Sequence, residues 1–287
     1  MNVSVSPSAS AYWRSRAEVE GAFWDIDFRL FDEVLTAQKS LGVSGDLLEI
    51  GALYGKSTIL LGLHAAAGEV VQVCDVFEQE TGDSANNAEN ESSYPGLARD
   101  KFEANYRRFV DTDPRVIQEL STSIARHVEP GTLRFAHVDG GHLFETVVDD
   151  LRNVKPLLAE GGIIVIDDFR ALHTPGVAAA AWAEVVDGGL VPFALSEQKM
   201  YASWGPTDAY ARHLDAWLQR SPDVENFGYQ DVKGHTVLIM ENPQRPTTVR
   251  GRIGRWVPPA LMPLLLPNRP GPHLGTRTRP RELGSGS

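Results

Sequence analysis

Short apolar runs alternate with amphipathic stretches along most of the chain, and this alternation predicts strands followed by helices. The stretches between the runs place apolar side chains at helical spacing, as Val147, Leu151 and Val154 do. Runs rich in Leu, Ile and Val that stay apolar throughout are typical of parallel strands covered on both faces. We expect such strands at 47–50, 70–77, 133–139 and 163–168. The pattern therefore predicts a doubly wound α/β sheet.

The second half of the chain continues the alternation with shorter connections. Apolar runs at 190–197, 199–205 and 235–241 predict further strands, and short links between them favour an antiparallel edge strand. Helices are expected at 15–40, 97–110, 143–158, 175–186 and 208–219. The expected fold is thus Rossmann-like, with a mostly parallel sheet, an antiparallel edge strand and helices on both faces.

Stretches without periodicity divide the chain. Residues 1–10 are Ser-rich and predict a disordered start, 11–242 form the expected domain, and the polar segment 79–96 is typical of a lid or binding loop. Residues 243–287 hold nine of the eighteen prolines, so they exclude long helices or strands. We expect this arm to pack on the body or on a second subunit; contact with a membrane surface and disorder are the alternatives. The final GSGS is typical of residues added to a natural chain.

Charge and composition narrow the function. The net charge is −11, but residues 243–287 carry +7, which leaves −18 on the remainder and disfavours nucleic-acid binding. The single cysteine, Cys74, cannot form an internal disulfide. Neither a membrane-spanning run nor a secretory leader is visible. We expect a cytoplasmic protein without stable membrane insertion that forms a homodimer or higher homo-oligomer and takes small polar substrates.

The stretch LLEIGALYGKSTILLG, residues 47–62, predicts a strand that passes through a glycine turn into a helix. Such a turn directs free backbone N–H groups at a ligand. Only three residues separate Gly51 from Gly55, one fewer than the phosphate loop of nucleotide hydrolases requires, and Leu53 interrupts the G-x-G-x-x-G pattern of dinucleotide-binding proteins. Both of these classes are therefore disfavoured.

Two acids beside the turn indicate a different ligand. Glu49 precedes Gly51, where it would repel phosphate and suit a cationic or zwitterionic group. Asp75 ends the second predicted strand, 24 residues after Gly51, a position where an acid accepts hydrogen bonds from ribose hydroxyls. Together they fit S-adenosylmethionine better than NAD or ATP.

Three further acids follow the third and fourth predicted strands. Asp139, Asp167 and Asp168 lie at strand ends that form the ligand crevice in open α/β sheets. Their carboxylates would repel one another unless a hard cation bound them, so the sequence predicts a site for Mg²⁺ or another divalent cation. The alternative is that Asp168 only caps the following turn and Asp139 alone contacts a ligand.

These segments resemble the class I S-adenosylmethionine-dependent methyltransferases. LLEIGALYGKS is similar to the first motif of that family, and VCDVF is similar to its acidic second-strand motif. HVDGGHLFETVVDDL and LLAEGGIIVIDDF are similar to the metal-dependent branch that methylates macrolide sugars. The resemblance implies a set of cofactor contacts: Glu49, Gly51, Tyr54, Gly55, Ser57, Asp75, Val76, Ser123 and Asp139.

The resemblance also implies an O-methyltransferase acting on a sugar hydroxyl of a glycoside, oligosaccharide or glycosylated natural product. A mannoside or rhamnoside is the finer expectation. The base is His142 or Asp139, and His142, Arg170 and His173 are expected substrate contacts, whereas His64 and His137 are expected in the core. A catechol-like or other small diol is the alternative acceptor, and a non-catalytic binding protein on the same fold is the alternative class.

Overall fold

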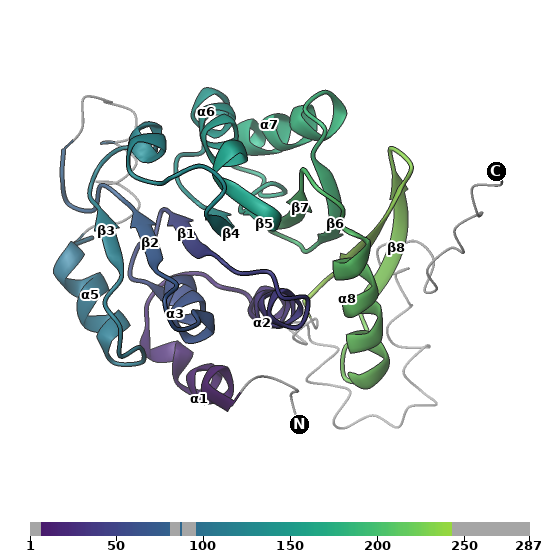
Figure 1. Ribbon diagram of the computed structural model, residues 1–287, viewed down its shortest axis with the longest axis horizontal. Helices are drawn as coiled ribbons and strands as arrows, with labels where there is room; N and C mark the ends of the chain where they lie inside the picture. The colour runs from purple at the N-terminus through teal and green to yellow at the C-terminus, as the bar shows by residue number, and fades with distance from the viewer. Residues whose placement is uncertain (1–6, 81–86, 88–95, 243–287) are drawn as a thin grey trace, which may run out of the picture.

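The computed structural model describes residues 7–80, 87 and 96–242, which form a single nine-stranded sheet (Figure 1). The order across the sheet is β3-β2-β1-β4-β5-β7-β6-β9-β8. The strands are β1 (Asp46–Ile50), β2 (Val71–Cys74), β3 (Arg115–Ile117), β4 (Leu133–Val138), β5 (Leu158–Ile166), β6 (Val191–Leu195), β7 (Met200–Ser203), β8 (Phe227–Val232) and β9 (His235–Met240).

The strand directions agree with the predicted doubly wound sheet, and they show which strands in the second half of the chain are antiparallel. β1, β2, β3, β4 and β5 are mutually parallel, with β1 at the point where the chain order reverses. β7 runs antiparallel between β5 and β6, and β8 is an antiparallel edge strand beside β9. The crevice beyond the carboxyl ends of β1 and β4 is therefore where a ligand is expected.

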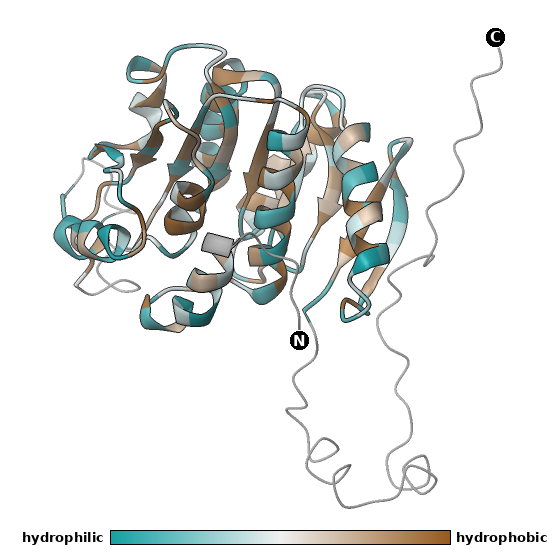
Figure 2. Cartoon of the chain, turned by 60° about the horizontal axis from the view of Figure 1, so that its bottom comes forward, coloured by the Kyte–Doolittle hydropathy of each residue, from teal (hydrophilic) through white to brown (hydrophobic). Residues whose placement is uncertain are grey.

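Helices cover both faces of this sheet (Figure 1). One face packs against α6 (Phe144–Val154), α7 (Pro175–Val186) and the 3₁₀ segment η2 (Ser121–Arg126). The opposite face packs against α1 (Pro7–Ser15), α2 (Asp25–Ser40), α3 (Lys56–His64), α5 (Arg99–Arg107) and α8 (Asp208–Arg220). The 3₁₀ segments η1 (Arg16–Glu18) and η3 (Lys155–Leu157) complete the set. Figure 2 shows the apolar strands between helices whose outer faces are polar.

Strand alternation decides which face each central side chain occupies. Leu48 and Ile50 of β1 belong to the core under α6 and α7, whereas Leu47 belongs to the core under α2 and α3. Because successive side chains of a strand point to opposite faces, Glu49 points toward α2 and α3 with Leu47. His137 of β4 takes the same direction, since it is paired in register with Glu49.

Three local expectations differ from the structure. Helix α1 begins at Pro7, inside the segment predicted to be disordered, because its Tyr12 is buried and donates a hydrogen bond to the carbonyl of Lys56 (2.7 Å). The helix expected over 15–40 is interrupted, and α2 begins only at Asp25. Strand β8 was not predicted; it pairs with β9 through a turn at Lys233 and Gly234, both at positive φ.

Two predicted segments lie largely or wholly outside the described residues: most of the loop 79–96 and the arm 243–287. Within the part of the chain that the structure describes, every helix is too short or too polar to cross a membrane.

Candidate active site

The glycine turn after β1 is held by close backbone contact with the end of β4. Gly51 has φ +80°, and a Cβ placed there would lie 1.9 Å from the carbonyl oxygen of Asp139. The Gly51 N–H donates to the carbonyl of Cys74 (2.9 Å), and the Asp139 N–H donates to the carbonyl of Ile50 (2.8 Å). Only glycine therefore allows β1 and β4 to approach this closely.

Asp75 closes the turn from the end of β2. Its Oδ2 accepts hydrogen bonds from the N–H groups of Ala52 (2.7 Å) and Leu53 (3.1 Å), and its Oδ1 accepts one from the Phe77 N–H (2.7 Å). Burial raises the pKa of this carboxyl, while the backbone donors lower it. Asp75 thus shapes the turn as well as standing where a ribose was predicted.

A cavity of about 480 Å³ lies beyond these strand ends. The turn and β2 contribute Gly51, Leu53, Asp75 and Val76, and η2 contributes Ser121 and Thr122. The ends of β4 and β5 contribute Asp139, His142, Asp167 and Asp168. The cavity therefore brings the predicted cofactor turn and the predicted acidic cluster into one space.

Two of the four described non-glycine residues with positive φ line this cavity. Leu53 (φ +48°) and Asp168 (φ +53°) adopt the left-handed region although neither is glycine. Such residues cost on the order of 1–3 kcal/mol each and gather at functional sites. Both line the cavity, which supports a functional origin for the strain.

The three predicted metal-binding aspartates converge with two histidines. Two sets of ligand atoms come within 4.8 Å of one another, His137–Asp139–Asp167 and Asp139–His142–Asp168, and Asp139 belongs to both. Burial raises the pKa of Asp139 well above its usual range, and the charge of Asp167 raises it further. Among the three aspartates, Asp139 is thus the one whose carboxyl most favours the neutral form.

His142 stands at the open side of this cluster, before α6. Its Nε2 lies 3.3 Å from Oδ2 of Asp168, and its ring centroid lies 6.1 Å from that of His173. Burial tends to raise the pKa of Asp168, but the contact with His142 lowers it, and the net shift is downward. His173 and Arg170 are exposed and do not line the cavity, although the contact with His142 places His173 beside its mouth.

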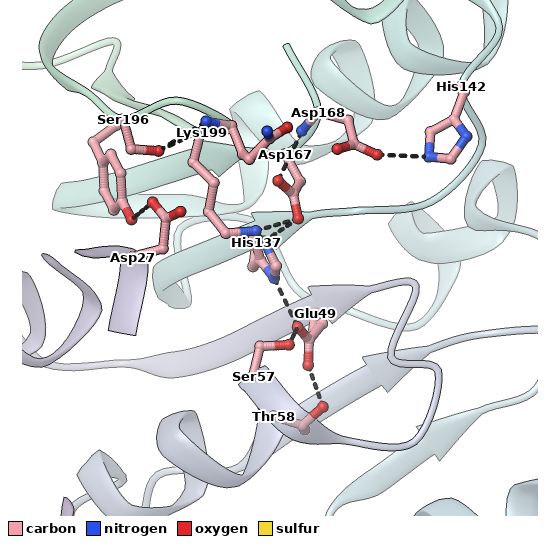
Figure 3. Close-up of polar contacts among 12 residues, drawn as sticks. Asp27, Glu49, Ser57, Thr58, His137, His142, Asp167, Asp168, Ser196 and Lys199 are labelled. Carbon is pink, nitrogen blue, oxygen red and sulfur yellow. Dashed lines mark hydrogen bonds and ion pairs between the residues drawn. The ribbon is translucent and has the colours of Figure 1, made fainter. Parts of the chain in front are cut away.

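Lys199 was missed by the sequence analysis, although it is the buried cation of the site. Its side chain is 2% exposed, and its ammonium group contacts Oδ2 of Asp167 and donates to Nε2 of His137 (3.0 Å) (Figure 3). Burial tends to raise the pKa of Asp167, but this ammonium group and a hydrogen bond with Asp139 lower it, and the net shift is downward. The sequence signal for Lys199 was a charged residue at the start of an apolar run. Its partners Asp167 and His137 lie 32 and 62 positions away in the sequence, so they could not be identified from it.

His137 links Lys199 to Glu49 on the buried side of the sheet (Figure 3). Burial and the charge of Lys199 hold the pKa of His137 well below its usual range, so its ring is neutral. Since Nε2 accepts from Lys199, Nδ1 carries the proton and donates to Glu49 (2.7 Å). Ser57 and Thr58 of α3 donate to the same carboxylate. The prediction that His137 is a core histidine is confirmed, as it is for His64, which pairs with Asp32.

Several residues that were predicted to contact the cofactor do not line the cavity. Glu49 is fully buried and does not line the cavity, because strand alternation turns it toward α3; burial raises its pKa to about 7. Ser57 is engaged with Glu49, and Ser123 is buried behind Ser121 and Thr122, which line the cavity in its place. Tyr54 and Gly55 form the rest of the turn but do not line the cavity.

Known proteins share this architecture and these motifs. Residues 48–169 match the family described as "Methyltransferase domain", a span that begins in β1 and ends just after Asp167 and Asp168. This part of the chain is therefore similar to a methyltransferase domain. The glycine turn, Asp75 and the acidic cluster all lie within the matched residues.

Two sugar-modifying enzymes are among the similar proteins. The 8-demethyl-8-(2,3-dimethoxy-alpha-L-rhamnosyl)-tetracenomycin-C 4'-O-methyltransferase of Streptomyces olivaceus is 29% identical over 142 residues, 45% of this chain and 54% of that relative. The chain thus spans about half the length of this curated relative. CalS11, a TDP-rhamnose 3'-O-methyltransferase, has a TM-score of 0.46 at 15% identity and covers 71% of this chain and 97% of its own.

The O-methyltransferase NovP gives a TM-score of 0.51 at 21% identity, over 62% of this chain and 80% of that chain. This likeness shows that the sheet and its covering helices have the Rossmann-like fold predicted from the sequence.

Proposed function

We propose that this protein is an S-adenosylmethionine-dependent O-methyltransferase that acts on a sugar hydroxyl with the help of a divalent cation. The observation that carries the proposal is the shared cavity: the glycine turn with Asp75 forms one wall, and three aspartates with His142 form another. The matched methyltransferase domain and a relative that methylates a rhamnosyl group support it.

The turn side of the cavity fits the methyl donor. Asp75 and Val76 stand at the end of β2, where a ribose would lie, and Gly51 leaves the backbone accessible. Ser121 and Thr122 supply hydroxyl groups on the adjoining wall. When bound, S-adenosylmethionine supplies an electrophilic methyl group on a cationic sulfonium, and the acidic lining favours such a charge.

The acidic side fits a hard divalent cation. Asp139, Asp167 and Asp168 offer carboxylate oxygens, which are the ligands that Mg²⁺ prefers. Burial and the neighbouring charge of Asp167 raise the pKa of Asp139, and a bound cation would favour the ionised form of this carboxyl. When bound, the ion lowers the pKa of a coordinated hydroxyl group and fixes its orientation. We assign these three aspartates as the ligands.

Two groups can take the acceptor's proton. Asp168 holds the imidazole of His142 at 3.3 Å, which orients the ring toward the cavity, and an oriented histidine is a suited general base at neutral pH. The raised pKa of Asp139 makes its carboxylate the other candidate base. His173 and Arg170 lie on the exposed segment beyond β5, where an acceptor would enter, and we propose them as acceptor contacts.

Binding calorimetry tests the proposal first. The wild-type protein is titrated with S-adenosylmethionine with and without Mg²⁺, and then screened for methyl transfer to phenyl rhamnoside, phenyl mannoside and catechol. We expect heat with the methyl donor and transfer to a glycoside that requires Mg²⁺. No heat with the donor contradicts the proposal at its base, and transfer to catechol alone assigns the acceptor to a different class.

A further inference from the structure

Lys199 is the positively charged side chain buried against the acidic cluster. It immediately precedes β7, in a tight turn where the Ser196 N–H donates to the Lys199 carbonyl (2.8 Å) and the Lys199 N–H donates to Oγ of Ser196 (2.8 Å). Its ammonium group also lies 5.7 Å from the ring centroid of Phe23 and 5.9 Å from that of Phe31. The turn and these rings fix where the charge lies.

The ammonium group is also held by a series of buried hydrogen bonds that runs through β4 and β1. His137 accepts one of its hydrogen bonds and is itself held by Glu49, which accepts from Ser57 and Thr58 (Figure 3). Each link is buried, so water cannot replace it without opening the core. Lys199 is therefore a charge with a fixed position.

The charge count of the cluster depends on this lysine. Asp139, Asp167 and Asp168 carry three negative charges when ionised, and Lys199, which contacts Asp167, leaves these four groups with a net charge of −2. A divalent cation brings the total of these four groups to zero, whereas a trivalent ion leaves them with an excess of one positive charge. Burying an uncompensated charge is strongly unfavourable.

We propose that Lys199 sets the charge of the metal site, so that the three aspartates are matched to a divalent cation and discriminate against a trivalent one. The inference rests on the metal site of the proposed function. Lys199 contacts one oxygen of Asp167 and acts through that carboxylate, so it is a positioning and selectivity residue. Repulsion between the ammonium group and a bound ion grows with the charge of the ion, which gives the proposal a measurable signature.

The test compares Ca²⁺ with Tb³⁺, which are of similar size but differ by one charge. Dissociation constants are measured on the full chain without methyl donor or acceptor, by calorimetry for Ca²⁺ and sensitised luminescence for Tb³⁺, in wild type, Lys199→Met and Lys199→Gln. If loss of the ammonium charge strengthens Ca²⁺ binding about tenfold, the gain for Tb³⁺ is about thirtyfold, because the repulsion scales with ionic charge. The selectivity for Tb³⁺ over Ca²⁺ then rises about threefold.

The control is Lys155→Met, because Lys155 also pairs with an acid, Glu184 at 3.3 Å, but is 43% exposed and outside the cavity. It should leave both constants unchanged. A purely structural role for Lys199 would weaken both ions equally, and an unchanged selectivity ratio overturns the proposal. If the neutral variants fold only with metal, the rise in their melting temperature with each ion gives the same comparison. Variants that stay unfolded with both ions show that the lysine serves the fold alone, which also overturns it.

Failure of the proposed function gives a different result. A wild-type protein that binds neither Mg²⁺ nor Ca²⁺ contradicts the metal site itself, whereas a wild type that binds them with variants of unchanged selectivity contradicts only the role of Lys199.

Discussion

The glycine turn after β1 and the acidic ends of β4 and β5 border the same cavity, but they are built in different ways. The turn is defined by backbone: Gly51 touches the Asp139 carbonyl, and Asp75 accepts three backbone N–H groups. The acidic ends are defined by side-chain charge, with Asp139 crowded by Asp167 and Asp167 paired with Lys199. Substitutions in the turn should therefore damage the fold, whereas substitutions in the cluster should damage chemistry and spare the fold.

The largest effect is expected at Asp139. Asp139→Asn removes a ligand and a candidate base, so methyl transfer should fall by at least about a thousandfold, or about 4 kcal/mol. Burial and the neighbouring Asp167 already favour the neutral form of this carboxyl, so the unfolding free energy should stay level or rise. Radiolabelled methyl transfer and thermal unfolding measure the two quantities. A variant that keeps a tenth of the activity would remove Asp139 from the chemistry.

In the glycine turn we expect the main effect of a substitution to be on stability. In Gly51→Ala the new Cβ meets the Asp139 carbonyl at 1.9 Å at a positive φ, so the unfolding free energy should fall by about 3 kcal/mol or more. Gly68→Ala is the matched control: its φ is +90°, but nothing lies within 4 Å of its Cβ, and it should cost about 1 kcal/mol. Urea unfolding measures both. Equal losses would mean that strained dihedrals, not the β1–β4 contact, restrict Gly51.

His142 is a sharper probe of the acidic side, because it separates the two candidate bases. His142→Asn should lower kcat about a hundredfold if the imidazole takes the proton, with little change in stability, since the side chain is partly exposed. His235→Asn, at an exposed position on β9, should leave kcat unchanged. A loss below about fivefold would assign the proton to Asp139.

The smallest effect concerns a buried acid that has no cation beside it. The carboxyl of Asp150 on α6 is buried, and this burial raises its pKa to about 7 although a contact with Ser121 lowers it. The folded protein holds this proton more tightly than the unfolded chain, so stability falls as pH rises from about 4 to 7. Asp150→Asn should therefore gain about 1–2 kcal/mol relative to wild type at pH 8 compared with pH 4.5.

Urea unfolding at the two pH values measures this difference. Asp111→Asn, at an exposed position away from α6, is the control and should show a much smaller difference. If Asp150→Asn changes the unfolding free energy by the same amount at both pH values, Asp150 does not titrate in this range.

The difference between the glycine turn and the acidic strand ends also explains which parts of the site could be predicted from the sequence. The strand–glycine–helix pattern is local, so β1, Gly51 and Asp75 could be located from spacing alone, and so could the strand ends that bear Asp139, Asp167 and Asp168. Glu49 was expected at the cofactor because it precedes the turn, but the alternation of β1 turns it to the opposite face. Only the positions of α3 and β4 in the fold show that Ser57, Thr58 and His137 form hydrogen bonds with its carboxylate.

Lys199 could not be assigned for a related reason. Its importance comes from β7, an antiparallel strand inserted between β5 and β6, which brings the turn at 196–199 against Asp167. Apolar periodicity predicted a strand there but not its neighbours. Similarly, Ser121 and Thr122 reach the cavity instead of Ser123, because the 3₁₀ segment η2, which decides the direction of each side chain, could not be predicted from spacing.

The contact between Gly51 and the Asp139 carbonyl has a consequence for redesign of this protein. The two walls of the cavity are in backbone contact where Gly51 meets the Asp139 carbonyl, so widening either wall there would displace the other. The segment beyond β5 is under no such restriction: Arg170 and His173 are exposed, and Leu172 between them is fully so. Libraries that aim to change the acceptor of the proposed methyl transfer should therefore vary 170–173 and leave the glycine turn intact.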